Sequence, residues 1–324
     1  MLVCTRGRPH LLEDCLRSVL ASTPSGCVVV LVEAGADRTP LGAVADDPRL
    51  HHVLAPQPGK SRQINQGLRA TALEVVVLTD DDCRVQPGWV TAMVSPFDDP
   101  AVGIVFGPVA GLSSVRDAAA HPAPPGPAPE VTWQYANGAA MAVRRSAVVA
   151  VGGFDERLGP GAPLHGEEHD LVLRLQEAGW EVRVAAAPPV EHLAWRSPDE
   201  DRENLLVYSM GAGAFLGAAL RLSPKRWART VLRRCRYQAS LWGHHEAEGL
   251  GFGPAASLAF LEGLVRGLAL RPRRFLEDPG RELASVAGDS TIRAVPQRRS
   301  LASSWRILPG NLRASRRSRS RRSR

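Results

Sequence analysis

The sequence predicts an α/β protein with a mainly parallel central sheet flanked by helices, followed by a helical, basic C-terminal region. Short apolar runs alternate with helix-like patterns through the first half of the chain, which is typical of parallel strands joined by crossover helices. Two of these runs end in carboxylates, as expected of a ligand site beyond the strand ends of an open sheet. Beyond Pro198 the pattern becomes helical and rich in arginine.

Strands are expected where apolar residues are continuous, because strands of a parallel sheet are buried on both faces. Residues 27–32 and 75–78 give the clearest runs, and they are followed by Glu33 and by Thr79 with three aspartates. Shorter strands are expected at residues 2–4, 53–54, 102–106 and 141–143.

Helices are expected where apolar residues recur every three or four positions. This pattern covers residues 10–21, 61–72, 145–151 and 170–178. The Ala- and Pro-rich residues 118–130 are expected to form a flexible surface loop that excludes water from the site. Residues 205–220 are uncharged but contain three glycines. A spanning helix needs about 20 apolar residues, so this stretch predicts a buried or interfacial helix.

Composition limits the class of protein. With 44% hydrophobic and 23% charged residues the chain is globular in type, not disordered or fibrous. Its five cysteines are odd in number and scattered without a CxxC pair. They indicate reduced thiols of a cytoplasmic protein, not a disulfide framework or a zinc site. No signal-peptide pattern is present at the N-terminus, which agrees with that location.

Charge divides the chain unevenly. Residues 1–224 carry 18 basic and 26 acidic side chains, whereas residues 225–324 carry 22 and 7. This asymmetry predicts a basic region that meets an anionic partner. Residues 224–236 and 257–270 are basic or apolar amphipathic stretches suited to an anionic membrane surface, or else ordinary helices packed on the rest of the chain. We therefore expect a catalytic domain over residues 1–198, a helical region over 199–310 and a disordered Arg/Ser tail over 311–324.

The acidic strand end at residues 80–82 is the first candidate site. Three adjacent carboxylates repel one another, so they are unfavourable unless a cation or solvent compensates them. Side chains two apart in a strand point to the same side, so Asp80 and Asp82 would offer two hard oxygen ligands to Mg²⁺ or Mn²⁺. The alternative is a solvated turn or a helix cap.

A second acidic group lies at residues 165–170. Glu167, Glu168 and Asp170 begin a predicted helix, whose dipole stabilises acids there. They also supply more negative charge than a cap requires. A carboxylate crowded by others has a raised proton affinity, which suits a general base that accepts a hydroxyl proton.

Taken together, these segments resemble family 2 glycosyltransferases, which have the nucleotide-binding fold called GT-A, over about residues 2–195. TRGRP at 5–9 is similar to the family's opening turn, and LVEAGAD at 31–37 to its nucleotide-base segment. KSRQINQGL at 60–68 resembles its "R-N-x-G-L" helix start, and TDDDC at 79–83 its metal-binding strand end. NGAAMAVRR at 137–145 resembles the acceptor side, and GEEHDLVLRL at 166–175 the segment with the catalytic base.

The resemblance implies roles for individual residues. Glu168 would be the base, and Asp170 would orient the site or the acceptor. Asp80, Asp82 and His192 would hold a divalent metal. The remaining set would bind the nucleotide diphosphate, and it comprises Thr5, Arg6, Arg8, Glu33, Arg62, Asp80 and Asp81. The chain departs from the family at Glu33 and Glu168, where Asp is usual, and at Arg62, two positions early.

The function implied is inverting transfer of a sugar from a nucleotide diphosphate-sugar to a hydroxyl of a glycan, lipid-linked or small-molecule acceptor, with Mn²⁺ or Mg²⁺. A role in cell-envelope polysaccharide or glycolipid synthesis at the inner face of the cell membrane is expected. A sugar nucleotidyltransferase is the nearest alternative, but Gly7 alone does not supply its Gly-rich phosphate loop. A non-catalytic scaffold is a further alternative. A nucleic-acid-binding module is disfavoured because no aromatic-rich surface accompanies the basic region.

Overall fold

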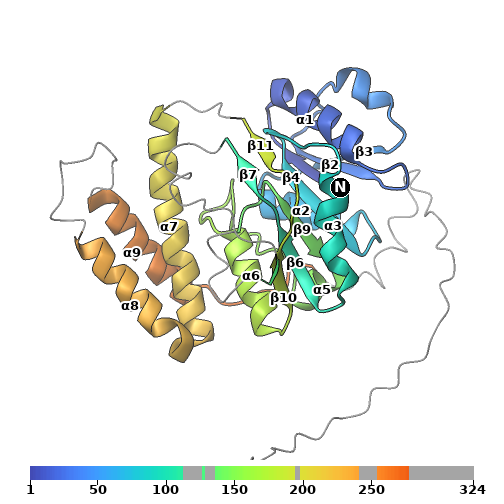
Figure 1. Cartoon of the computed structure of the whole chain (residues 1–324). Coiled ribbons are helices and arrows are strands. Elements are labelled where there is room, and N and C mark those ends of the chain that lie inside the picture. The colour runs from blue at the N-terminus through green and yellow to red at the C-terminus, as the bar shows by residue number, and fades with distance from the viewer. Residues whose placement is uncertain (112–125, 128–135, 194–197, 241–253, 277–324) are drawn as a thin grey trace, which may run out of the picture. The chain divides into compact units, whose positions relative to one another are not determined.

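The structure is a computed structural model that describes residues 1–111, 126–127, 136–193, 198–240 and 254–276 (Figure 1). Met1–Pro279 form one compact unit, and residues 280–324 lie outside the described residues. The expected tail at 311–324 lies there too. So does the expected loop at 118–130, except Gly126 and Pro127, which form a short strand.

A mainly parallel eight-stranded sheet is the centre of the fold, as predicted. Its order is β3-β2-β1-β4-β9-β6-β10-β8. Strands β1, β2, β3 and β4 are mutually parallel, and β6 is parallel to β10, whereas β9 runs antiparallel to both of its neighbours. The strands are β1 Leu2–Thr5, β2 Val29–Ala34, β3 Leu50–Ala55, β4 Val75–Asp80, β6 Val102–Phe106, β8 Gly126–Pro127, β9 Met141–Arg144 and β10 Glu181–Val184.

Helices cover both faces of this sheet. Alternate side chains of the strands point to opposite faces, so two separate apolar clusters form. One contains residues of α1 and α3, and the other contains residues of α2, α5 and α6. The helices are α1 Pro9–Ser22, α2 Lys60–Arg69, α3 Trp89–Val94, α5 Arg145–Ala150 and α6 Glu167–Glu177, with short 3-10 turns η1 Gly42–Asp46 and η2 Ser95–Asp98.

A second, three-stranded sheet lies beyond the end of β4. Its order is β5-β11-β7, with β5 Cys83–Arg84, β7 Val109–Ala110 and β11 Val190–His192. Strand β5 pairs antiparallel with β11, which places Cys83 opposite His192. This small sheet therefore brings a residue from late in the chain to the acidic strand end.

Three helices follow in the C-terminal part of the described chain: α7 Pro198–Leu222, α8 Pro224–Ser240 and α9 Pro254–Ala269. The glycines of the stretch at 205–220 do not break α7; they let it pack closely on α9. A Cβ on Gly213 or Gly217 of α7, or on Gly263 or Gly267 of α9, would lie within 3.0 Å of the other helix's backbone. Within the described residues, no helix has both the length and the apolar character needed to cross a membrane.

The chain returns from α9 to the large sheet. The backbone amides of Phe275 and Leu276 both donate hydrogen bonds to the carbonyl of Gly152, at 2.7 and 3.0 Å. The side chain of Leu276 is 1% exposed and belongs to the apolar cluster under α2, α5 and α6. Residues beyond the expected boundary at 198 thus complete the core of the first domain.

Candidate active site at the carboxyl ends of β1 and β4

The acidic residues lie beside the end of β1 because β1 and β4 are parallel neighbours, with Cys4 in register with Asp80. Thr5 donates a hydrogen bond from Oγ1 to Asp81 Oδ2 at 2.6 Å. The guanidinium of Arg8 contacts Asp81 at 2.5 Å and Asp82 at 2.8 Å. The TRGRP turn therefore holds two of the three aspartates.

The expectation that Asp80 and Asp82 lie together in one strand is wrong, because β4 ends at Asp80 and the next two residues form a turn. Asp80 instead faces Lys60, whose Nζ lies 2.7 Å from its Oδ1. Asp82 faces Arg8 and His192. Burial raises the pKa of Asp81 to about 6, although Arg8 and Thr5 oppose that rise.

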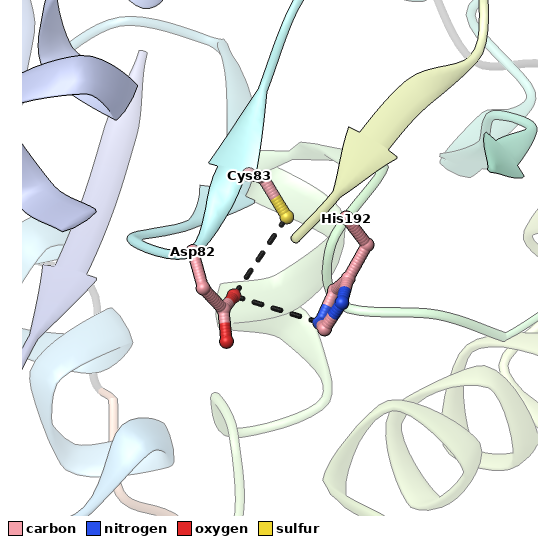
Figure 2. Close-up of side chains that lie close together, drawn as sticks. All are labelled: Asp82, Cys83 and His192. Atoms are coloured by element: carbon pink, nitrogen blue, oxygen red, sulfur yellow. Dashed lines mark hydrogen bonds and ion pairs between the residues drawn. The ribbon is translucent and has the colours of Figure 1, made fainter. Parts of the chain in front are cut away.

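Asp82, Cys83 and His192 form a cluster whose ligand atoms all lie within 4.8 Å of one another (Figure 2). Asp82 Oδ1 is 3.5 Å from His192 Nε2 and 3.8 Å from Cys83 Sγ. An oxygen and a nitrogen at this separation fit one divalent ion, and Mn²⁺ accepts both donor types. The soft sulfur does not suit Mn²⁺ or Mg²⁺, so Asp82 and His192 are the residues that would hold such an ion.

Lys60 joins the two acidic groups that the sequence presents separately. Besides Asp80, its Nζ approaches Glu168 Oε1 at 3.8 Å, and its side chain is 15% exposed. Burial lowers the pKa of Lys60, but Asp80 and Glu168 more than reverse this, so the ammonium stays charged. Gly138 lies directly against this pair, and a Cβ there would overlap both Lys60 Nζ and Glu168 Oε1.

Glu167 and Glu168 are buried neighbours at the start of α6 and hydrogen-bond to each other. Burial and the charge of Glu168 raise the pKa of Glu167 to about 8. Burial also acts to raise the pKa of Glu168, but Lys60 outweighs it and the pKa is lowered. The crowding argument is therefore wrong for Glu168: Glu167 keeps the proton and Glu168 is the ionised partner.

This arrangement predicts how stability varies with pH. A carboxyl whose folded pKa is raised stabilises the fold below its unfolded pKa, near 4.5, and that contribution is lost as pH rises through about 8. Glu167→Gln keeps the hydrogen-bond donor without the titration. We expect it to gain stability relative to wild type from pH 5 to 8 by up to about 1.4 kcal/mol per pH unit.

Urea unfolding of both proteins across this pH range measures the difference. Glu177→Gln, on the same helix but with a side chain 36% exposed, is the control and should follow wild type. Parallel stability curves for Glu167→Gln and wild type would show that Glu167 does not hold the proton.

The structure places Asp170 and Arg62 in contacts of other kinds. Asp170 Oδ2 accepts hydrogen bonds from Arg174 at 2.8 and 2.6 Å, and Arg174 in turn donates to the carbonyls of Val151 and Gly153. This network holds the loop after α5 against α6. Arg62 contacts Glu156 at 3.1 Å and Gln57 at 2.6 Å.

Glu33 lies at the end of β2 with its carboxylate turned toward β3. It accepts hydrogen bonds from the Thr39 amide at 2.9 Å and pairs with His52 Nε2 at 2.8 Å. Burial acts to raise the pKa of Glu33, but these hydrogen bonds outweigh it and lower the pKa. Arg6, from the same turn as Arg8, is exposed.

Three features of this site are not predicted from the sequence. They are the ion pairs of Lys60, the proton held by Glu167, and the position of Cys83 beside His192. A signal for Lys60 exists. The chain has 40 basic residues, and only Lys60 and Lys225 are lysines. A lysine in an arginine-biased chain is a signal because its compact ammonium differs from a planar guanidinium in the sites it can occupy.

Part of the sequence is similar to known glycosyltransferases. Residues 1–141 match the family model for glycosyl transferase family 2. A pre-mycofactocin glycosyltransferase of Mycobacterium tuberculosis is 34% identical over 165 residues, which cover 47% of this chain and 33% of that protein. An N-acetylglucosaminyltransferase of Bradyrhizobium elkanii is 32% identical over 111 residues, covering 32% of this chain and 61% of that protein. The match thus spans about a third of the mycobacterial relative's length.

Among solved structures, a mannosyltransferase from Pyrobaculum calidifontis, in complex with GDP-Man and Mn²⁺, superposes with a TM-score of 0.53 at 17% identity. The likeness covers 82% of this chain and 86% of that one. At this identity the likeness shows the fold alone, and it confirms the predicted GT-A architecture.

Proposed function

We propose that the protein transfers a sugar from a nucleotide diphosphate donor to an acceptor hydroxyl, with inversion at the anomeric carbon, since residues 1–141 match the glycosyl transferase family 2 model. The observation that carries this proposal is the bridge from Asp80 through Lys60 to Glu168. It places an ionised carboxylate next to the acidic strand end, where the donor's diphosphate would bind.

Glu168 is the general base of this proposal. Its lowered pKa keeps it ionised at neutral pH, so it can accept the acceptor's hydroxyl proton. The acceptor oxygen then forms its bond to the anomeric carbon as the bond from that carbon to the diphosphate oxygen breaks. The electron pair leaves with the nucleoside diphosphate. Lys60 positions Glu168, and Glu167 supports it through the shared hydrogen bond.

The donor side is formed by the turn after β1 and the end of β4. Arg8 is held by Asp81 and Asp82 with its side chain 26% exposed, and in this proposal its guanidinium contacts the diphosphate. Asp82 and His192 would hold the divalent ion, which when bound neutralises charge developing on the leaving group. Thr5, Arg6, Glu33, Arg62, Asp80 and Asp81 remain our candidates for nucleotide contacts, and Asp170 for orienting the site.

The acceptor is proposed at the level of chemical class. We propose a glycan, lipid-linked or small-molecule hydroxyl in cell-envelope synthesis at the inner face of the cell membrane. The names of the relatives above do not give a common acceptor, so they do not choose among these classes for this chain.

A screen of nucleotide sugars tests the proposed function. UDP-, GDP- and dTDP-sugars are added with Mn²⁺, and the melting temperature is measured, because a ligand of the folded state raises it. Donors that bind are then assayed for release of nucleoside diphosphate. A metal-dependent shift with one nucleotide class, followed by release, is the expected result. Release of pyrophosphate from a nucleoside triphosphate and sugar phosphate would indicate a nucleotidyltransferase instead.

Asp82 is expected to dominate metal binding. Residues that only orient metal ligands typically cost 10–100-fold in affinity when replaced, so Asp82→Asn, a direct ligand, should weaken Mn²⁺ binding by at least about 100-fold. The electron paramagnetic resonance signal of free Mn²⁺ measures the affinity without an activity assay. Asp98→Asn, at an exposed position of η2, is the control. Equal Mn²⁺ affinities of Asp82→Asn and wild type would show that the metal does not bind at this cluster.

A further inference from the structure

One face of α9 exposes apolar side chains, although the opposite face packs tightly on α7. The exposed residues follow one another at spacings of three, four and three, which places them in a line along the helix. The exposed fraction reaches 55% for Leu258 and 66% for Val265. We call this set the α9 stripe, and it consists of Leu258, Leu261, Val265 and Leu268.

The rest of α9 has few polar groups that could interact with water. Its only charged side chains, Glu262 and Arg266, pair with each other at 2.5 Å. Gly263 and Gly267 are taken up by the close contact with α7. Single exposed apolar residues are ordinary, but a continuous line of them marks a surface that contacts an apolar partner.

The basic side chains of the neighbouring helix α8 indicate that this partner is negatively charged. Trp227 and Val231 of α8 share an apolar cluster with Phe260 of α9, so the two helices lie together (Figure 1). Helix α8 carries six basic side chains and no acidic one. Five basic residues of α8 are exposed and form no ion pair with an acidic residue within the described chain, namely Lys225, Arg229, Arg233, Arg234 and Arg236.

Three more exposed arginines, Arg271, Arg273 and Arg274, follow the end of α9. A second copy of this chain would bring the same positive charge against this surface, and the repulsion opposes self-association. An anionic lipid surface instead attracts each arginine near it.

We propose that α8 and α9 together bind an anionic phospholipid surface, with the α9 stripe at the boundary of the acyl chains and the arginines at the phosphates. The 16-residue α9 would lie in the plane of the interface, as amphipathic helices with basic flanks do. Arginine stems extend along the apolar surface while their guanidinium groups reach the headgroups. The inference concerns attachment and is independent of the transfer reaction.

Vesicle flotation with the full chain tests it. Wild type should float with vesicles of equal phosphatidylcholine and phosphatidylglycerol, and not with phosphatidylcholine alone. The double variant Leu258→Glu/Val265→Glu should lower the partition coefficient by at least about tenfold. Leu73→Glu makes the same change at a side chain 48% exposed between α2 and β4 and should bind like wild type.

A second variant separates charge from apolar contact. Arg229→Gln/Arg233→Gln should lower binding to the mixed vesicles by about fivefold for each residue replaced. Circular dichroism and melting temperature check that each variant folds, as exposed positions should allow. Undiminished binding of the double glutamate variant, or equal binding of wild type to neutral vesicles, would overturn the proposal. The proposal would also be overturned if sedimentation velocity showed that wild type is a dimer and that the Leu258→Glu/Val265→Glu variant is a monomer. In that case a second copy of the chain would cover the α9 stripe.

Discussion

Replacing Glu168 by glutamine should reduce sugar transfer by about 10²–10⁴-fold, the usual contribution of a positioned general base. The amide keeps the shape of the carboxylate but cannot accept the acceptor's proton. Since Glu168 acts on the chemical step in our proposal, kcat should fall while KM stays near its wild-type value. Single-turnover assays with saturating donor and Mn²⁺ measure the rate directly.

Two controls make this result specific. Glu177→Gln changes the same residue type on the same helix, where the side chain is 36% exposed, and should keep full activity. The Mn²⁺ affinity of Glu168→Gln should equal that of wild type, because Glu168 is not a proposed ligand. Full activity of Glu168→Gln together with loss in Glu167→Gln would exchange the roles of the two glutamates.

Gly263→Ala should destabilise the protein by more than about 2 kcal/mol, although alanine is the better helix former. Intrinsic propensity alone favours alanine over glycine within a helix by about 1 kcal/mol. In α9, however, a Cβ at Gly263 would lie within 3.0 Å of the Met210 carbonyl oxygen and the Ala214 amide nitrogen, both backbone atoms of α7. Backbone cannot rotate away as a side chain can, so the helices must separate along their length.

The sign of the effect distinguishes packing from propensity. Gly26→Ala is the matched control, since a Cβ there meets nothing within 4 Å, and it should change stability little. Chemical unfolding of both variants gives the free energies. A more stable Gly263→Ala would mean that α7 and α9 do not make this backbone contact.

The sequence predicts those elements that depend on local pattern. The strands β2 and β4 are continuous apolar runs, and α1 and α2 have the helical period, so their existence is readable without a structure. Strand β10 is missed because its alternation of charged and apolar residues, EVRV, covers only four positions, which is too short to stand out. Helix α3 is missed because six residues are too few to show a period.

The site is less predictable because its geometry depends on distant segments. Acidic residues at 80–82 and 167–170 can be recognised by composition, but their connection through Lys60 requires the start of α2 to approach β4 and α6 together. The location of the proton on Glu167 depends on which carboxylate lies nearer that ammonium. The glycines of α7 and α9 suggest broken helices when each helix is read alone, and only the pair shows that they are contact points.

The return of the chain to Gly152 has a consequence for biosynthesis. Leu276 leaves the ribosome after every strand of the large sheet, yet its side chain is part of the apolar layer beneath α2 and α5. Until Leu276 has been translated, this apolar cluster lacks one of its buried side chains. A polypeptide that ends just before Leu276 would expose part of this apolar cluster to water. Nascent chains arrested there should therefore be digested by proteases more readily than the full-length protein.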